Sequence, residues 1–167
     1  MEIERKFTLK YLPEDLDNYP CYHIEQAYLC TSPVVRIRKQ DDSYILTYKG
    51  GGMLAREEYN LPLTKEAYEH LRQKADGNII SKKRYRIPLL NPDFRKEYPV
   101  PVNDYPLTIE LDIFDPPFAP LCMAEVEFGS LEAAEAFLPP DWFDEDVTFH
   151  KEYHNSYMST QKMEDYK

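Results

Sequence analysis

Acidic residues alternate along three segments of the chain, in pairs two residues apart. The pairs are Glu2 with Glu4, Glu110 with Asp112, and Glu125 with Glu127. Because side chains two apart on a strand point to the same face, each pair directs both carboxylates the same way. Carboxylates gathered together repel one another unless a cation lies among them, and oxygen ligands without His or Cys favour Mg²⁺ or Mn²⁺ over Zn²⁺. We therefore expect these six residues to bind one or two such ions, which would activate a water molecule.

Basic residues on other segments form a complementary set. Its members are Lys6, Arg36, Arg38, Lys49, Lys82 and Arg84, and whether Arg86 joins them is left open. Arginine presents a planar fork that suits phosphate oxygens, and lysine supplies a point charge. A ligand with linked phosphates would neutralise these bases and bridge to a metal ion held by the acids. Phosphoryl transfer needs mainly positioning and charge stabilisation, so the two sets together predict hydrolysis of a triphosphate.

Three further features have alternative interpretations. Glu58 lies on a basic segment, and we expect it to orient Lys82 or Arg84 by ion pairing within the substrate site. The glycines at 50–52 lack the Lys-Ser/Thr of a phosphate-binding loop and are more typical of a hairpin turn. No histidine has metal-ligand spacing, so surface or hydrogen-bonded positions are expected for all of them.

The charged residues lie on segments that alternate with the period of a β-strand. The predicted strands are the first segment around residues 2–7 and the segments 34–39, 44–49, 56–61, 80–87, 107–114 and 123–128. A sheet with one solvent-exposed face would explain the alternation of charged and apolar residues in any single strand. It would not require the strands to be sorted by the sign of their charges. Here the acids occupy the first and the last two strands, and the bases occupy the middle ones.

A closed antiparallel β-barrel with the charged stripes inside accounts for this sorting and leaves no open sheet edge. Its interior must be wet, internally paired and filled by ligand, because each buried unpaired ion costs several kcal/mol. Two helices are predicted outside it, one from the cap Thr64 to about Asp76 and one from the cap Ser130 to about Leu138. Weaker helical signals lie at 13–16 and after Asn155. Short proline-rich stretches, such as 99–101, are expected to form turns.

Composition narrows the class of protein. The 167 residues fit a single domain, 1–167, and the 43% of apolar residues exclude a disordered chain. The net charge of −10 disfavours nucleic acid as a partner. The chain has no run of about 18 apolar residues, so no membrane span is predicted. It also has no apolar N-terminal segment typical of a secretory signal, and a cytoplasmic location is therefore expected. The three cysteines have no pairing or zinc-binding spacing and are expected to be free thiols.

The chain also resembles the CYTH superfamily, the triphosphate tunnel metalloenzymes, along nearly its whole length. The motifs that carry the resemblance occur in the family's order: Glu2-Ile3-Glu4-Arg5-Lys6, Val35-Arg36-Ile37-Arg38, Leu46-Thr47-Tyr48-Lys49-Gly50, Arg56-Glu57-Glu58, Lys82-Lys83-Arg84-Tyr85, Ile109-Glu110-Leu111-Asp112 and Ala124-Glu125-Val126-Glu127-Phe128. The resemblance implies an eight-stranded antiparallel tunnel with a few flanking helices, which makes the protein mainly β within the α+β class.

The resemblance also implies roles for individual residues. It implies Mg²⁺ or Mn²⁺ binding by Glu2, Glu4, Asp112, Glu125 and Glu127, with Glu110 a further candidate, and triphosphate binding by Lys6, Arg36, Arg38, Lys49, Lys82 and Arg84. Of these, we expect a direct part in catalysis for Glu2, Glu4, Lys6, Lys82 and Arg84. Where many members have Tyr-Lys-Asn near the C-terminus, this chain has Tyr153-His154-Asn155. If the family's lysine contacts phosphate, that contact is either lost in this chain or supplied by Lys151.

Several functions remain open for such a site. The small bacterial-type members that this chain resembles are inorganic triphosphatases, which convert tripolyphosphate to pyrophosphate and phosphate. The alternatives are a class IV-type adenylyl cyclase, a thiamine triphosphatase and a non-catalytic polyphosphate-binding module, which would need the basic strands but not the acidic ones. In each case the expected partner is a small phosphorylated molecule rather than nucleic acid or a membrane, and both a monomer and a homodimer are compatible with the sequence.

Overall fold

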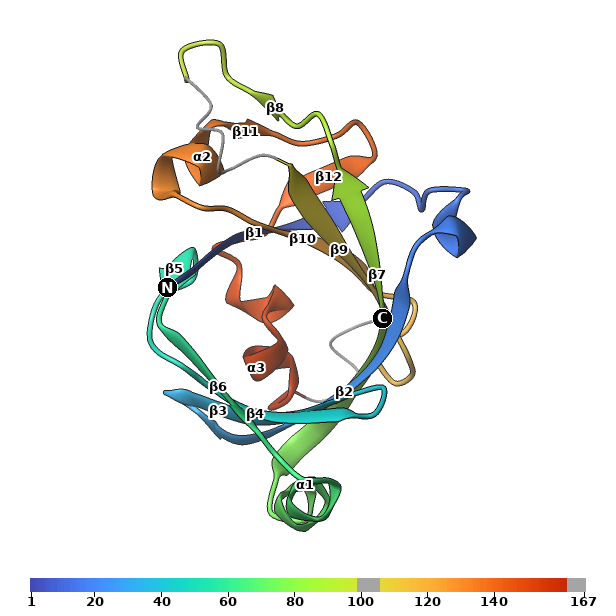
Figure 1. Cartoon of the computed structure of the whole chain (residues 1–167), viewed down its shortest axis with the longest axis vertical. Helices are drawn as coiled ribbons and strands as arrows, with labels where there is room; N and C mark the ends of the chain where they lie inside the picture. Colours follow the sequence, from blue (N-terminus) through green and yellow to red (C-terminus); the bar gives the residue numbers. More distant parts are fainter. Residues whose placement is uncertain (99–105, 162–167) are drawn as a thin grey trace.

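A computed structural model describes residues 1–98 and 106–161 of the chain, which are mainly β (Figure 1). Ten strands form one antiparallel sheet: β1 (Glu2–Leu9), β2 (Cys21–Thr31), β3 (Val34–Gln40), β4 (Ser43–Lys49), β5 (Ala55–Arg56), β6 (Glu58–Pro62), β7 (Asp76–Leu89), β9 (Leu107–Phe114), β10 (Cys122–Glu127) and β12 (Phe143–Asp146). A second small sheet pairs β8 (Asp93–Phe94) with β11 (Phe137–Leu138). The helices are α1 (Lys65–Arg72), α2 (Leu131–Ala136) and α3 (Asn155–Met158), with 3₁₀ turns η1 (Leu16–Asn18) and η3 (Lys151–Tyr153). The prediction of a large antiparallel sheet with few helices is confirmed.

The strand order brings the sorted charges together. The sheet runs β12-β1-β10-β9-β7-β2-β3-β4-β6, and β5 pairs with the other end of β1. The three acidic strands β1, β10 and β9 are therefore neighbours, although β1 begins the chain. The strands curve around the C-terminal segment that contains α3 (Figure 1).

The sheet has ten strands where eight were expected. The segment 55–62 divides at Glu57 into β5, which pairs with β1, and β6, which pairs with β4. The short strand β12 adds a further partner for β1. One continuous stretch of chain thus contacts both β1 and β4, which lie far apart in the strand order of the sheet.

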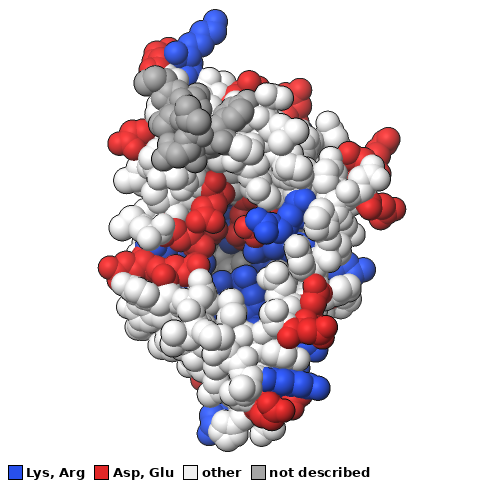
Figure 2. Space-filling view, viewed as in Figure 1, with Lys and Arg blue, Asp and Glu red and all other residues white. Residues whose placement is uncertain are grey.

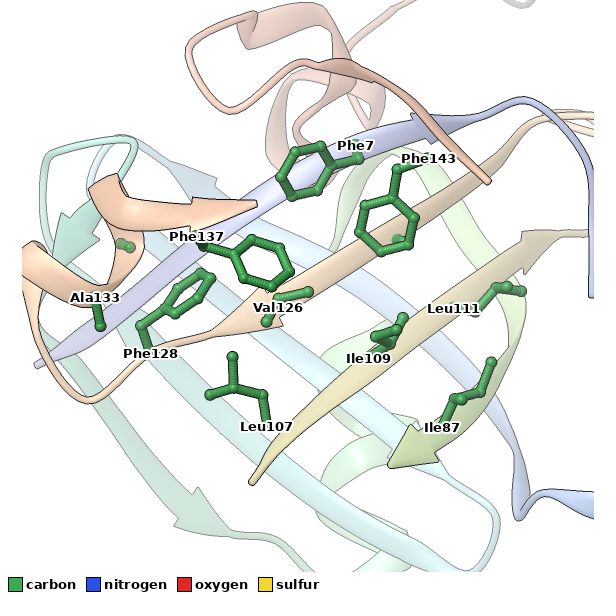
Figure 3. Packing of buried hydrophobic residues seen from close by; sticks show 12 residues of the cluster. Phe7, Ile87, Leu107, Ile109, Leu111, Val126, Phe128, Ala133, Phe137 and Phe143 are labelled. Atoms are coloured by element: carbon green, nitrogen blue, oxygen red, sulfur yellow. The ribbon is translucent and has the colours of Figure 1, made fainter. Parts of the chain in front are cut away.

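The outer face of β1, β10, β9 and β7 carries the largest apolar cluster. Phe7 of β1 packs against Phe137 and Phe143, with ring centroids 6.3 and 4.9 Å apart (Figure 3). Arg5 also points to this side, where its guanidinium donates to the backbone oxygens of Ala134 and Phe137. The α2–β11 segment is therefore held against the outside of the acidic strands.

Two smaller clusters cover other parts of the sheet. Tyr68 of α1 packs with Ala27 and Ile37 on the outer face of β2 and β3. At one end of the sheet, Met158 of α3 packs with Phe114 and neighbouring apolar residues. The apolar stripes thus face outward or close one end, and the charged stripes are left for the inner face.

The helices begin where predicted but end earlier. Thr64 and Ser130 cap α1 and α2 by accepting hydrogen bonds from the backbone N–H groups of Ala67 and Ala133, each at 3.1 Å. Helix α1 ends at Arg72 rather than near Asp76, so the helix stops well before Gly77. Gly77 lies in β7 with a φ of +73°, and a Cβ there would lie 2.1 Å from the backbone oxygen of Ser159. Its small size is needed for contact with the C-terminal segment.

Helix α2 ends at Ala136 because the next two residues form β11 and pair with β8. The glycines at 50–52 lie in the connection between β4 and β5, which agrees with the predicted turn, and Gly52 has a φ of +112°. The turn expected at 99–101 lies outside the described residues. Within the described ranges, none of the helices combines the length and apolar character needed to cross a membrane.

Phe7→Ala is expected to lower the free energy of unfolding by about 3–5 kcal/mol, because it opens a cavity among three packed aromatic rings. Urea unfolding measures this change. Phe149→Ala is the matched control, because Phe149 is 64% exposed and should change stability by less than about 0.5 kcal/mol. Equal effects of the two substitutions would contradict the packing described for Phe7.

Candidate active site

The inner face of the sheet surrounds a cavity of about 270 Å³. Figure 2 shows this hollow, with acidic side chains on its upper and left sides and basic side chains on its lower and right sides. All of the predicted site residues except Asp112 line it: Glu2, Glu4, Lys6, Arg36, Arg38, Lys49, Glu58, Lys82, Arg84, Arg86, Glu110, Glu125 and Glu127. The structure therefore brings together residues from seven strands, and it resolves the open question of Arg86 by placing it at the cavity.

Carboxylates are crowded on the acidic side because β1, β10 and β9 are adjacent. In the register of these strands, Glu4 lies opposite Glu127, and Glu125 lies opposite Glu110. Burial, together with the nearby charges of Glu125 and Glu2, raises the pKa of Glu4 to about 8. Burial and the charge of Glu110 also raise the pKa of Glu127. Such carboxylates favour the arrival of a cation, because positive charge relieves their mutual repulsion.

Two lysines partly neutralise this side. Lys6 Nζ lies 3.3 Å from a carboxylate oxygen of Glu125. Lys49 Nζ lies 2.7 Å from Glu2 and 3.2 Å from Glu58. The expected pairing of Glu58 with Lys82 or Arg84 is therefore wrong. The reason is the register, because Glu58 of β6 lies directly opposite Lys49 of β4.

Asp112 occupies a different environment from the other acids. Its side chain is 1% exposed, and its two oxygens accept hydrogen bonds from Arg84 at 2.7 and 2.8 Å. Lys82 Nζ lies 2.8 Å from the same carboxylate. Burial opposes ionisation, but Arg84 and Lys82 outweigh it and lower the pKa of Asp112. The expected role of Asp112 as a metal ligand stays a prediction, and its observed contacts are with two cations.

Arg84 connects the basic side of the cavity to the acidic side. Besides Asp112, it contacts Glu110 and lies 3.6 Å from Glu125. Its neighbour Lys82 is 1% exposed, and burial lowers the pKa of Lys82 to about 7 despite the charge of Asp112. These two cations are therefore held in place before any ligand binds.

Arg36 and Arg38 have no carboxylate within ion-pair distance among the described residues. Arg38 donates two hydrogen bonds to Oε1 of Gln26, at 2.9 and 2.7 Å. The buried Nε of Arg36 has no hydrogen-bond partner in the described part of the chain. Burial and the neighbouring cations Arg36 and Arg84 lower the pKa of Arg38. One buried and one half-buried arginine, without an acid between them in the described part of the chain, favour an anionic ligand.

Some residues that line the cavity were not predicted from the sequence. They are Tyr22, Tyr28, Val34, Gln40, Ile45, Arg56, Asn60, His154, Asn155 and Ser156. Alternation gave a signal for Arg56, which lies two residues before Glu58. No strand was predicted where β2 lies, so the sequence gave no signal for Tyr22 and Tyr28.

His154 forms a hydrogen bond, as expected, but it lies at the cavity, which was not expected. It is 8% exposed, and its Nε2 lies 2.8 Å from the backbone oxygen of Thr148. Because a carbonyl only accepts, this contact places the ring proton on Nε2. Burial and the charge of Lys6 lower the pKa of His154 to about 4, so the ring is neutral near pH 7. Lys151 does not line this cavity, and its Nζ lies 5.3 Å from the centroid of the Tyr157 ring.

The donor set fits a hard divalent cation. The acidic side offers carboxylate oxygens on three adjacent strands. Burial, with repulsion from neighbouring carboxylates, raises the pKa of Glu4 and Glu127, and a cation among them would relieve that repulsion. Within residues 1–98 and 106–161, no three acidic, histidine or cysteine side chains are already gathered as a metal-binding group. Instead, Lys6 contacts Glu125 and Lys49 contacts Glu2 and Glu58, so a metal ion would compete with these lysines for the carboxylates.

Comparison with known proteins agrees with this geometry. Residues 1–154 match the CYTH domain family. An inorganic triphosphatase of Nitrosomonas europaea is 37% identical over 158 residues, which cover 92% of this chain and 93% of that protein. The crystal structure of the inorganic triphosphatase NE1496 superposes with a TM-score of 0.65 at 31% identity, covering 97% of this chain and 96% of that one. A second crystal structure of NE1496 gives a TM-score of 0.64 at 30% identity, covering 97% and 99%.

The metal-free protein is expected to lose stability as the pH rises from about 5 to about 8. Over this range folded Glu4 keeps a proton that the unfolded chain has released, since its pKa is about 8 in the fold and 4.5 ordinarily. Glu4→Gln should reduce this loss by on the order of 2 kcal/mol. Urea unfolding in the presence of a chelator at several pH values measures it.

Glu14→Gln provides the control, because Glu14 is exposed and lies outside the cavity. It should leave the pH dependence of unfolding unchanged. The same slope in the parent protein and in Glu4→Gln would show that Glu4 is not crowded by its neighbours.

Proposed function

This chain belongs to the CYTH domain family, and on that basis we propose that it hydrolyses inorganic tripolyphosphate to pyrophosphate and phosphate with the help of a divalent metal ion. The observation that carries the proposal is the two-sided cavity, which has carboxylates on three adjacent strands and, across from them, Arg36 and Arg38, neither of which pairs with an acid among the described residues. The first side suits a cation and the second suits a polyanion. A metal-bound triphosphate supplies both charges in one ligand.

Substrate binding in this proposal depends on the basic side. Arg36 and Arg38 bind phosphate oxygens, since neither has a carboxylate partner in the described part of the chain. Lys82 and Arg84 bind a second phosphate from positions that Asp112 fixes. We assign Asp112 this positioning role. Arg86 lies toward an exposed edge of the cavity and adds positive charge there.

The metal ion would be held on the acidic side by Glu2, Glu4, Glu110, Glu125 and Glu127, and we propose Mg²⁺ or Mn²⁺ because all of the donors are oxygens. A bound ion of this kind neutralises developing negative charge and lowers the pKa of a water molecule. Lys6 and Lys49 neutralise the carboxylates while the site is empty of metal. With a metal ion bound to these carboxylates, Lys6 and Lys49 would be free to contact the phosphates.

The reaction that these residues support is an attack of water on a terminal phosphorus atom. A new P–O bond forms to the water oxygen, the bond to the bridging oxygen breaks, and pyrophosphate leaves with the bonding electrons while a proton is released. Lys82 and Arg84 act by stabilising the charge that develops on the phosphoryl and bridging oxygens. Their contacts with Asp112 keep them in position before the substrate arrives, so little reorganisation is needed.

We further propose that the sheet acts as a closed tunnel within a single domain of residues 1–167. The continuous segment 55–62 supports this, because its two halves pair with β1 and β4. Closure limits the access of water to the charges and so strengthens their interactions with the substrate. A cytoplasmic location fits an enzyme that uses a small phosphorylated substrate.

Purified protein is expected to release phosphate from tripolyphosphate with Mg²⁺ or Mn²⁺, and a chelator should abolish the release. A colorimetric phosphate assay measures this, with ATP and thiamine triphosphate as competing substrates in parallel. Cyclic AMP formed from ATP would indicate a cyclase instead. Metal-independent binding of polyphosphate without turnover by either metal, in folded protein, would reduce the site to a binding module.

Arg36→Gln is expected to lower kcat/KM for tripolyphosphate by about 100-fold or more, because a buried charge that faces a polyanion in a confined site is lost. Steady-state kinetics measure it. Arg72→Gln is the matched control, since Arg72 is 44% exposed and pairs with Glu25 outside the cavity. It should change kcat/KM by less than about twofold. An equally small effect of Arg36→Gln would remove Arg36 from the substrate site.

A further inference from the structure

A second pocket, of about 560 Å³, lies beside the active-site cavity. Its lining includes the glycines at 50–52, Lys151 and Tyr157, and we call it the Lys151 pocket. It shares Val34, Arg56, His154 and Ser156 with the active-site cavity. These four residues therefore lie at the boundary between the two spaces.

The charge of the Lys151 pocket sets it apart from the rest of the protein. The whole chain has 30 acidic residues against 20 basic ones, yet none of the described residues that line this pocket is acidic. Lys151 forms no ion pair with a described residue, and its Nζ lies against the Tyr157 ring. Arg56 contributes the second cation and is 4.0 Å from its nearest carboxylate, that of Glu2. Two cations thus face a space whose other described lining groups are hydroxyl, glycine and apolar groups and the imidazole of His154.

We propose that the Lys151 pocket is an accessory binding site for a phosphate group, adjacent to the site of hydrolysis. Lys151 and Arg56 supply the charge, and hydroxyl groups such as that of Ser156 supply hydrogen-bond donors. The phosphate has two possible sources, the end of a polyphosphate chain longer than three or the inorganic phosphate released by hydrolysis. This inference rests on the proposed function for the identity of its ligand.

The wall of the pocket allows a direct test of its charge. A Cβ added at Gly51 would meet no atom within 4 Å, so a side chain fits there without displacing its neighbours. Gly51→Asp would then bring a carboxylate to the pocket, and Gly51→Asn would bring a neutral group of the same shape. Gly52 is unsuitable, because its φ is +112° and a Cβ would lie 2.3 Å from the backbone oxygen of Ala55.

Binding is measured calorimetrically with a chelator present, so that no turnover occurs. The probes are tripolyphosphate, tetrapolyphosphate and inorganic phosphate, the last added to protein already saturated with tripolyphosphate. Lys151→Gln is expected to weaken binding of tetrapolyphosphate, of inorganic phosphate or of both by about three- to tenfold, and to change tripolyphosphate binding by less than about twofold. Gly51→Asp should act in the same direction, whereas Gly51→Asn should not.

Lys83→Gln is the control for the lysine, because Lys83 is exposed on β7 and lines neither space. Weaker tetrapolyphosphate binding alone would identify the source as a longer chain, and weaker binding of inorganic phosphate would identify it as the product. If Lys151→Gln weakens the binding of neither tetrapolyphosphate nor inorganic phosphate, or weakens tripolyphosphate binding equally, the accessory site is ruled out. Phosphate binding that depends on Lys151 in a protein without triphosphatase activity would support the pocket while rejecting the proposed function, so the two failures can be told apart.

Discussion

The structure depends on a balance of opposite charges around one cavity. A buried charge is tolerated only when a charge of the other sign or a set of hydrogen bonds compensates it. Here Lys6 pairs with Glu125, Lys49 pairs with Glu2, and Asp112 holds Arg84. The compensation is incomplete on both sides of the cavity. The acids remain crowded, and Arg36 and Arg38 have no carboxylate partner within residues 1–98 and 106–161, so a metal-bound polyanion would complete a balance that the protein leaves unfinished.

The rest of the fold positions these charges. Alternation along each strand sends apolar residues outward, where clusters around Phe7 and Tyr68 are covered by α2, β11 and α1. The stability of the sheet thus comes mainly from its outer face, and its inner face is free to carry charge. The C-terminal segment performs a different task. Met158 packs at one end of the sheet, while His154 of the same segment lines the cavity.

Similarity to the Nitrosomonas europaea enzyme extends over almost the whole of both chains, and the cavity explains in physical terms why a triphosphate is a suitable substrate. The carboxylates require a cation, and the arginines require several anionic oxygens within a confined space. His154 adds a group that is neutral at pH 7, near the boundary with the Lys151 pocket. The positive charge beyond that boundary comes from Arg56 and Lys151, so the character of the two spaces differs: the first combines both signs, and the second has only one.

The sequence by itself determined seven of the strand segments, the inward direction of most site residues and the sorting of acids from bases, because a period of two and the order of charges are local properties of the chain. It also predicted both helix caps, but it did not predict β2 or β12. The tertiary structure decided which charges meet: Glu58 pairs with Lys49, Asp112 is enclosed by Lys82 and Arg84, and the segment 55–62 divides between two partners. It also brought His154 to the cavity. Alternation fixes the face on which a side chain lies, but register and strand order, which depend on packing between distant segments, fix its neighbours.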